Sequence, residues 1–429
     1  MNYQEALDYI HSINWTFCKP GLERISLLCE KLGNPQNNLK FIHVAGTNGK
    51  GSVCAMLSAI LTKAGYKTGL YTSPYIKTFN ERMAINGEPI SDDELVELTE
   101  YIRPIADAME DKPTEFELIT AVAFEYFSRN HCDLVVLECG LGGRLDSTNI
   151  IETPVLSLIT GVALDHTSIL GNTVEAIAEE KAGIIKHGCP ALFGNNSHEH
   201  EALGVIRRVA SQKQAPFVVT DESALRSIRY GVDGTLFDFG EEKDYKLRLL
   251  GVYQPYNAAT VLTAIQSLRY SGYEISENAV RSGLASVTWP ARFERLSDDP
   301  IVIYDGGHNP QGIAAAKKSI EVYFKDQQIL LLTGVMRDKD YSPMVRSLAP
   351  LAEKVFTVTP NNPRALSAEE YAAVFEMHKI KATAFSSIEE AVRAAIEDSR
   401  ENGIPLVCLG SLYLYSDVYD AVKKAIGTV

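Results

Sequence analysis

Residues 41–52 read Phe-Ile-His-Val-Ala-Gly-Thr-Asn-Gly-Lys-Gly-Ser, and this stretch decides the fold of the N-terminal half of the chain. The apolar run 41–45 predicts a buried strand, and the pattern over 53–64 predicts a helix. Three glycines between them permit a tight turn whose N–H groups face inward, beside the positive end of the helix dipole. Lys50 is placed to reach the β- and γ-phosphates of a nucleotide, and Ser52 to ligate Mg²⁺.

The spacing departs from the common phosphate-loop form G-x-x-x-x-G-K-[ST]. Gly51 separates Lys50 from Ser52, and Val44 stands where that form has its first glycine. A purely structural turn is therefore an alternative. A lysine and a serine between a strand and a helix favour the nucleotide site.

Composition bounds the classes of protein that remain. The 429 residues suggest two or three domains, with 45% hydrophobic and 22% charged residues, as in ordinary globular proteins. A formal net charge of −14 argues against nucleic acid or a membrane as a general partner, although a local basic cleft can still bind an anionic substrate. Seven scattered cysteines without a C-x-x-C pair indicate reduced thiols and a cytoplasmic location. Neither a secretory signal nor an apolar run long enough to span a bilayer is evident.

Strand-like and helix-like patterns alternate along almost the whole chain, which predicts parallel sheets covered by helices on both faces. We expect an α/β protein: a P-loop, ATPase-like N-terminal domain (1–287) with a parallel central sheet and a side sheet, a linker (288–293), and a smaller Rossmann-like C-terminal domain (294–429). The side sheet is expected within 215–251, from the runs 217–219 and 246–250. Expected strands of the parallel sheets are 40–45, 67–72, 133–138, 155–160, 301–304, 328–333, 354–358 and 405–409.

Polar residues follow several of these strands, where ligands gather in parallel α/β sheets. Glu138 ends a buried strand and suits Mg²⁺, with a satisfied strand-end carboxylate as the alternative. Ser73 is either a phosphate or metal contact or an ordinary turn residue. His166 is either a ligand or structural. Lys181 lies in a helical pattern whose lysines usually face solvent.

The second half of the chain repeats the arrangement of strand, glycine turn and helix. Residues 303–310 read Ile-Tyr-Asp-Gly-Gly-His-Asn-Pro, so that Asp305 and His308 follow an apolar strand. The two residues are suited to contact a ribose or a phosphate. The alternative is an ordinary turn between a strand and a helix, without a binding role. Arg292 is a candidate source of positive charge, or a surface residue.

These stretches, in this order, resemble the folylpolyglutamate synthase/dihydrofolate synthase family of the Mur ligase superfamily. The resemblance spans nearly the whole chain and rests on the motifs 45–52 (AGTNGKGS), 72–74 (TSP), 79–82 (FNER), 140–146 (GLGGRLD), 165–166 (DH), 180–186 (EKAGIIK), 289–292 (WPAR), 305–310 (DGGHNP) and 410–413 (GSLY).

The resemblance implies ATP-dependent amide formation. A folate carboxylate receives the γ-phosphoryl group, and the amine of L-glutamate attacks the resulting acyl phosphate. Charge neutralisation by Mg²⁺ and cations, together with orientation of the reactants, would drive such a reaction. Substrates would be folate and glutamate, cofactors ATP and two Mg²⁺ ions, and the enzyme a monomer.

By the same resemblance, the catalytic residues would be Lys50, Glu138, His166, Lys181, Asp305 and His308. The binding contacts fall into three groups. ATP contacts would come from Asn48, Gly49, Lys50, Gly51, Ser52, Asn257, Arg292 and Asp305. Metal contacts would come from Ser52, Ser73, Glu138, His166 and Lys181, the last as a carbamate. Substrate contacts would come from a loop with Pro74, Tyr75, Phe79 and Arg82, from Arg144, and from His308 and Ser411 in the C-terminal domain.

Three positions depart from the family pattern. Tyr75 and Tyr253 stand where many members carry His, and Gly307 replaces a common Ala. The leading hypothesis is a folylpolyglutamate synthase that extends tetrahydrofolate at its γ-carboxylate. Alternatives are a bifunctional enzyme that also joins dihydropteroate to glutamate, a Mur-type peptidoglycan ligase, and a nucleotide-binding regulator without catalysis.

Overall fold

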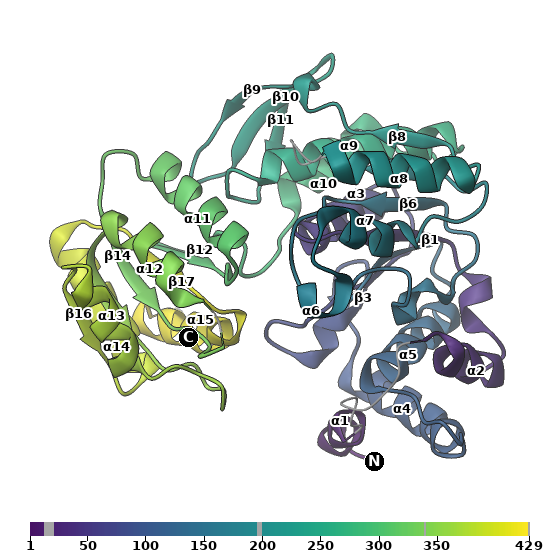
Figure 1. Ribbon diagram of the computed structural model, residues 1–429, viewed down its shortest axis with the longest axis horizontal. Helices are drawn as coiled ribbons and strands as arrows, with labels where there is room; N and C mark the ends of the chain where they lie inside the picture. The colour runs from purple at the N-terminus through teal and green to yellow at the C-terminus, as the bar shows by residue number, and fades with distance from the viewer. Residues whose placement is uncertain (13–20, 195–199, 339, 428–429) are drawn as a thin grey trace. The chain divides into compact units, whose positions relative to one another are not determined.

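The computed structural model describes residues 1–12, 21–194, 200–338 and 340–427, so Cys18 lies outside the described residues. The chain forms two compact units, and Figure 1 colours the chain by residue number from the N-terminus to the C-terminus. Unit 1 is Met1–Arg226, Asp238–Tyr245 and Tyr256–Val287, and unit 2 is Ser227–Phe237, Lys246–Pro255 and Thr288–Val429. Unit 2 therefore also takes two short segments from within the stretch 1–287.

Unit 1 is built on an eight-stranded sheet in the order β4-β3-β2-β5-β1-β6-β7-β8. The strands from β2 to β8 in this order run parallel, and the hairpin β3–β4 adds antiparallel strands at one edge through the turn at Asn86 and Gly87. The strands are β1 (Phe41–Ala45), β2 (Thr68–Tyr71), β3 (Met83–Ile85), β4 (Glu88–Pro89), β5 (Leu134–Glu138), β6 (Leu156–Ile159), β7 (Ala191–Phe193) and β8 (Phe217–Val219).

Helices cover this sheet because its strands are apolar on both faces. Phe41, at one end of β1, lies in a core formed with α1, α2, α4 and α5, and Ala45, at its other end, lies in a core formed with α7 and α8. On the chain between β1 and β2, α3 is buried along most of its length and packs against α10. The helices are α1 (Tyr3–His11), α2 (Glu23–Lys31), α3 (Lys50–Lys63), α4 (Asp92–Asp107), α5 (Glu115–Arg129), α6 (Thr167–Leu170), α7 (Val174–Ala182), α8 (His200–Gln212), α9 (Gln254–Tyr270) and α10 (Glu277–Ser286).

A separate three-stranded sheet has the order β11-β10-β9 and is visible as its own element in Figure 1. Its strands are β9 (Leu225–Arg229), β10 (Thr235–Phe239) and β11 (Glu242–Leu247). The expected side sheet is present, but the assignment of 217–219 to it is wrong. That run is β8, which pairs in parallel with β7, because its short apolar sequence extends the main sheet.

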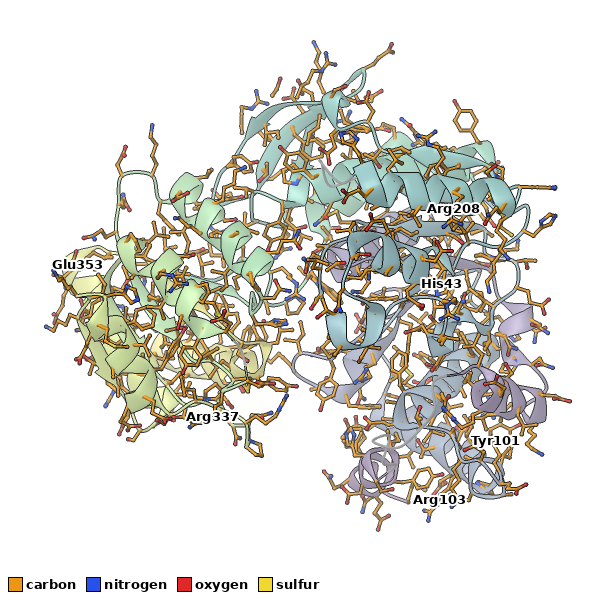
Figure 2. The ribbon with its side chains drawn as sticks, in the orientation of Figure 1. His43, Tyr101, Arg103, Arg208, Arg337 and Glu353 are labelled. Carbon is orange, nitrogen blue, oxygen red and sulfur yellow. The ribbon has the colours of Figure 1, made fainter. Side chains whose placement is uncertain are left out.

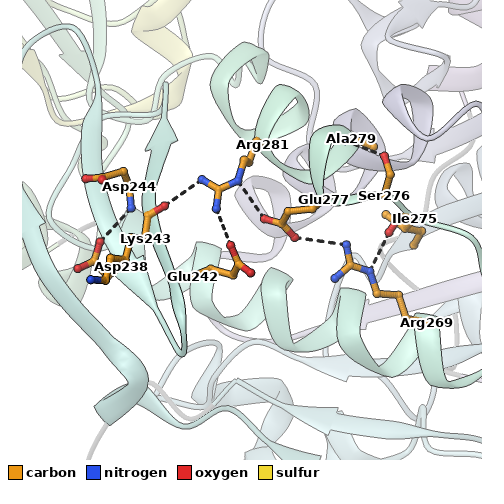
Figure 3. Close-up of polar contacts among 10 residues, drawn as sticks. All are labelled: Asp238, Glu242, Lys243, Asp244, Arg269, Ile275, Ser276, Glu277, Ala279 and Arg281. Carbon is orange, nitrogen blue, oxygen red and sulfur yellow. Dashed lines mark hydrogen bonds and ion pairs between the residues drawn. The ribbon is translucent and has the colours of Figure 1, made fainter.

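Arg281 of α10 holds the start of β11, next to the turn from β10 (Figure 3). Its guanidinium donates to the carbonyl of Lys243 at 2.9 Å and to Glu242 at 2.8 Å, and its Nε atom lies 3.2 Å from Glu277. The start of β11 is thereby fixed to a helix of unit 1.

Unit 2 contains a six-stranded sheet in the order β12-β13-β17-β14-β15-β16. All neighbours are parallel except β12, which runs antiparallel to β13 at the edge. Its strands are β12 (Glu294–Asp298), β13 (Ile301–Asp305), β14 (Ile329–Thr333), β15 (Ala352–Thr357), β16 (Ala382–Ala384) and β17 (Leu406–Leu409), and its helices are α11 (Pro310–Tyr323), α12 (Tyr341–Leu348), α13 (Ala368–Met377), α14 (Ile388–Asn402) and α15 (Tyr415–Ala425).

The two parallel sheets confirm the expected α/β fold class. Among the described residues, no helix is both long and apolar enough to cross a membrane.

Candidate functional site

The loop predicted to bind phosphate (residues 46–52, called the phosphate loop) follows β1 and enters α3, as its sequence predicts. Gly49 caps α3 with a left-handed φ of 83°, and Gly46 has a φ of 151°, so both positions use the freedom of glycine. The amine of Lys50 folds back and donates to the carbonyls of Gly46 and Thr47 at 3.0 and 3.2 Å. The loop therefore forms a turn in which the Lys50 amine is held by the loop's own carbonyl groups.

The loop after β6 forms hydrogen bonds with the phosphate loop. Thr160 donates from its hydroxyl to the carbonyl of Asn48 at 2.7 Å. Thr47 donates from its backbone nitrogen to Gly161 at 2.9 Å and from its hydroxyl to Ala163 at 3.1 Å. A Cβ at Gly49 would lie 2.7 Å from Oδ1 of Asn257, so α9 brings Asn257 directly against the turn.

Glu138 is the last residue of β5 and lies level with Val44 of β1, so it ends at the same sheet edge as the phosphate loop. It is 4% exposed, and its Oε2 atom accepts a hydrogen bond of 3.3 Å from the backbone nitrogen of Ser73, which follows β2. Parallel topology therefore places Ser73, Glu138 and the start of α3 with Ser52 at the same edge of the sheet, although they lie far apart in sequence.

Lys181 is not on a solvated helix face: it is 3% exposed within α7. Burial, and secondarily the nearby charge of Lys50, lowers the pKa of Lys181 to about 7. An amine with such a pKa is substantially neutral near pH 7, which is the form that reacts with carbon dioxide to give a carbamate.

His166 is the most exposed of the predicted metal contacts in unit 1. Its side chain is 58% exposed, and its Nε2 atom lies 4.0 Å from Asp165. It adopts a left-handed φ of 48° immediately before α6. Within the described residues, no group of three or more His, Cys, Asp and Glu side chains is arranged to hold a metal ion.

A cavity of about 670 Å³ lies beside the loop that follows β5 (residues 139–147, the β5 loop). It has apolar and charged walls from α5, α6 and the β5 loop. Its lining residues are Gly21, Arg24, Arg82, Thr114, Glu115, Phe116, Glu117, Ile119, Leu141, Arg144, Leu145, Asp146, Ser147, Ile169, Leu170 and Glu180.

Two predicted substrate residues, Arg82 and Arg144, line this cavity. The Nε atom of Arg82 is buried and has no hydrogen-bond partner in the described part of the chain, while its guanidinium lies 5.2 Å from the ring of Tyr75 and 5.6 Å from that of Phe79. Arg144 instead pairs with Glu180 at 2.8 Å. Pro74, Tyr75 and Phe79 are not among the lining residues.

The loop that carries Pro74 and Tyr75 is shaped by Glu81. Its carboxylate accepts hydrogen bonds from the backbone nitrogens of Ile76, Lys77 and Thr78, at 3.0 to 3.3 Å. This explains the acid in the FNER motif, which fixes the loop from within.

Sequence reasoning missed the α5 wall of the cavity and Arg24. The signal for α5 was present, because Thr114 and Glu117 form a capping box that starts the helix. Arg24 gave no signal: its partner Glu117 lies 93 residues away in sequence.

His43, in the middle of β1, belongs to the core rather than to the site (Figure 2). Its Nε2 atom lies 2.8 Å from the hydroxyl of Thr148 and 3.1 Å from the Cys139 sulfur. Burial lowers the pKa of His43 to about 3, so it remains neutral and joins β1 to the β5 loop.

In unit 2, the predicted residues gather at the carboxyl ends of β13 and β17, which are adjacent and in register, with Asp305 opposite Leu409. Asp305 is 4% exposed. His308 lies 3.0 Å from the Gly306 carbonyl through Nδ1, and Ser411 is buried, its hydroxyl accepting from Tyr413 at 3.2 Å. Burial raises the pKa of the Asp305 carboxyl above its ordinary value, and the nearby positive charge of Arg292 partly offsets this effect.

Comparison with known proteins identifies the class. The Mur ligase middle domain matches residues 44–265, and the Mur ligase glutamate ligase domain matches residues 291–412. These are the domains of ATP-dependent ligases, and the chain is an enzyme of this class.

Individual relatives narrow the class. The chain is 38% identical to the dihydrofolate synthase/folylpolyglutamate synthase of Bacillus subtilis, over 98% of this chain and 99% of the relative. It is also 38% identical to the folylpolyglutamate synthase of Lacticaseibacillus casei, over 97% and 98%. The solved folylpolyglutamate synthase of Mycobacterium tuberculosis, complexed with ADP and AMPPCP, superposes with a TM-score of 0.87 at 29% identity, over 99% of both chains. The chain belongs to the folylpolyglutamate synthase/dihydrofolate synthase family, as its motifs predicted.

Proposed function

We propose that the protein adds L-glutamate to the γ-carboxylate of tetrahydrofolate and its short polyglutamates. A carboxylate oxygen attacks the γ-phosphorus of ATP, and ADP leaves. The glutamate amine then attacks the acyl carbon and loses a proton, and inorganic phosphate leaves with one former carboxylate oxygen. The observation that carries this proposal is that the β5 loop borders the cavity, while Glu138, the residue before this loop, ends at the same edge of the sheet as the phosphate loop.

ATP is held in this proposal by the amides of Asn48 to Ser52 and by Lys50, with Asn257 closing the turn. The inward amides and the ammonium complement the charge that develops during phosphoryl transfer. Arg292 and Asp305 provide the nucleotide contacts of unit 2.

The residues present suit Mg²⁺, which prefers oxygen ligands. Ser52, Ser73 and Glu138 offer such ligands, and His166 can complete a site from the loop after β6. We assign a second ion to Lys181 as a carbamate, because its amine is buried and readily neutral. Bound there, Mg²⁺ would neutralise charge on the phosphate oxygens.

The folate ring system is assigned to the unit 1 cavity, whose walls include Phe116, Leu141 and Leu145. Arg82 supports placing the substrate in this cavity, since its buried Nε has no hydrogen-bond partner among the described residues and suits a carboxylate on the glutamate part of the folate. The aromatic rings of Tyr75 and Phe79 hold its guanidinium in place, with Pro74 at the start of the loop. Arg144 lines the same cavity and pairs with Glu180. His308 and Ser411 are assigned to the glutamate side, in a C-terminal ligase domain that begins after the linker 288–293.

A bifunctional enzyme is the second candidate, because the chain is equally identical to a relative named for both activities and to one named for one. Purified protein supplied with dihydropteroate, ATP, Mg²⁺ and glutamate separates the two. Dihydrofolate formation would establish the second activity, and phosphate release no greater than background would exclude it. We further propose that the enzyme is cytoplasmic and monomeric. Its molar mass, measured by light scattering, tests the monomeric state.

The direct test of the main proposal is a panel of tetrahydrofolate, methylenetetrahydrofolate and folate with ATP, Mg²⁺ and glutamate. Glutamylated product, lost in Lys50→Ala, is expected. Continued glutamate incorporation in Lys50→Ala would refute the phosphate-loop assignment.

A further inference from the structure

Asp305 is held by three donors within unit 2. The hydroxyl of Tyr253 donates to its Oδ2 atom at 3.1 Å, and the backbone nitrogen of Phe293 donates to the same atom at 2.9 Å. The backbone nitrogen of Gly307 donates to Oδ1 at 2.7 Å. Tyr253 is the only side chain among these three, so it is the part of the arrangement that a substitution can remove.

The ring of Tyr253 has a fixed place. Gly251 adopts a φ of 109°, and a Cβ at that position would lie 3.0 Å from the Tyr253 ring. Burial raises the pKa of the Tyr253 phenol well above its usual value, so the hydroxyl keeps its proton throughout the working range of pH. It is therefore a constant donor toward Asp305.

Other charged and titratable groups around Asp305 have different partners. Arg292 precedes β12 and donates to the carbonyl of Ala291 at 3.2 Å. Glu294 of β12 accepts from the Ala291 nitrogen at 2.8 Å, and Tyr304 of β13 donates to the Ser411 carbonyl at 2.5 Å. His308 contacts the Gly306 carbonyl. Arg292 attracts the Asp305 carboxylate by charge, whereas Tyr253 fixes its orientation.

We propose that Tyr253 is a positioning residue for ligation: its hydroxyl fixes the orientation of the Asp305 carboxylate for the proposed contact with the nucleotide. The inference rests on the proposed role of Asp305. Tyr253 itself touches neither reactant in this account, and acts through the carboxylate.

Tyr253→Phe keeps the ring and removes the donor. Loss of one hydrogen bond to a charged group should lower kcat/KM for ATP about tenfold. This value is at the low end of the range for such bonds, because two backbone donors to Asp305 remain. The lost donor also raises the pKa of Asp305, so the acid limb of the pH profile moves to higher pH, by up to about one unit. Tyr323→Phe is the matched control: Tyr323 is a neighbouring, partly buried tyrosine whose hydroxyl accepts from the backbone nitrogen of Gly251 and has no described hydrogen bond with Asp305. It should leave the acid limb unchanged.

A double-mutant cycle with Asp305→Asn separates positioning from general destabilisation. In single-turnover assays, Tyr253→Phe should cause no further loss in the Asp305→Asn background. Two results would overturn the inference about Tyr253 but not the role of Asp305. One is a rate loss in the double variant equal to the product of the two single losses. The other is a pH profile of Tyr253→Phe equal to that of wild type while Asp305→Asn is impaired. Full activity in Asp305→Asn would instead overturn the proposed role of Asp305. If Tyr253→Phe does not fold, Tyr253→His retains an N–H donor and should keep an acid limb near that of wild type; a limb shifted upward by about one unit would contradict the inference.

Discussion

Arg24 binds Glu117 through two hydrogen bonds of 3.0 and 3.1 Å, although the two side chains are only 10% and 4% exposed. The pair joins α2 to the first turn of α5, where Glu117 also accepts from the backbone nitrogen of Thr114 at 2.6 Å. It therefore fixes the wall of the cavity that presents Phe116.

Arg24→Met should destabilise unit 1 by about 3 kcal/mol, because it leaves the buried Glu117 carboxylate without its cation. Urea unfolding followed by a unit 1 signal measures this. The control is Arg208→Met, which breaks an exposed pair with Glu179 on the same unit and should cost less than about 1 kcal/mol. If the two substitutions lowered the free energy of unfolding equally, the buried Arg24–Glu117 pair would contribute no more to stability than an exposed pair.

Gly49→Ala should abolish tight nucleotide binding. The new Cβ meets Asn257 at 2.7 Å and the backbone has a φ of 83°. Gly65→Ala is matched, since Gly65 has a φ of 94° with nothing within 4 Å of the Cβ, at the other end of α3. Calorimetry with AMPPCP should show affinity lost in the first variant and retained in the second. Wild-type affinity in Gly49→Ala would contradict the placement of the phosphates.

Lys181→Met should stabilise the protein in metal-free, carbon dioxide-free buffer near pH 7. The pKa of about 7 in the folded protein lies below the ordinary lysine value of 10.5, so the unfolded state binds more protons between these values and wild-type stability rises with pH across that window. The gain from the substitution should be about 5 kcal/mol at most below pH 7 and should fade toward pH 10.5. Urea midpoints at several pH values test this. A pH-independent difference would show that Lys181 is not charged and buried in the apo fold.

The same substitution should remove most ligase activity if Lys181 carries a carbamate. Intact mass of the native wild-type protein in bicarbonate should show added carbon dioxide that is absent in Lys181→Met. An unmodified wild-type protein with full activity would contradict the carbamate.

The sequence predicted the parts of the fold that depend on local pattern. The run 41–45 and the glycines after it predict a strand, a turn and a helix, and Glu138 is recognisable as a strand end. The run 217–219 was misassigned, because an apolar triplet does not reveal which sheet it joins. Lys181 was informative only through resemblance, since its helical pattern alone predicts a solvated face.

Contacts between distant segments were out of reach. Arg24 and Glu117, or Tyr253 and Asp305, become neighbours only when the sheets assemble, and neither residue of either pair marks the other in sequence. The cavity was invisible for the same reason. Its walls come from α2, α5, α6 and the β5 loop, none of which predicts a hollow by itself.

The most direct measurement uses a folate substrate labelled with ¹⁸O in its γ-carboxylate, incubated with ATP, Mg²⁺ and glutamate. Mass spectrometry should find a product longer by one glutamyl residue and inorganic phosphate that carries one ¹⁸O atom, because the carboxylate oxygen leaves with phosphorus. Glutamylated folate with unlabelled phosphate, or no glutamylated folate at all, would contradict ligation through an acyl phosphate.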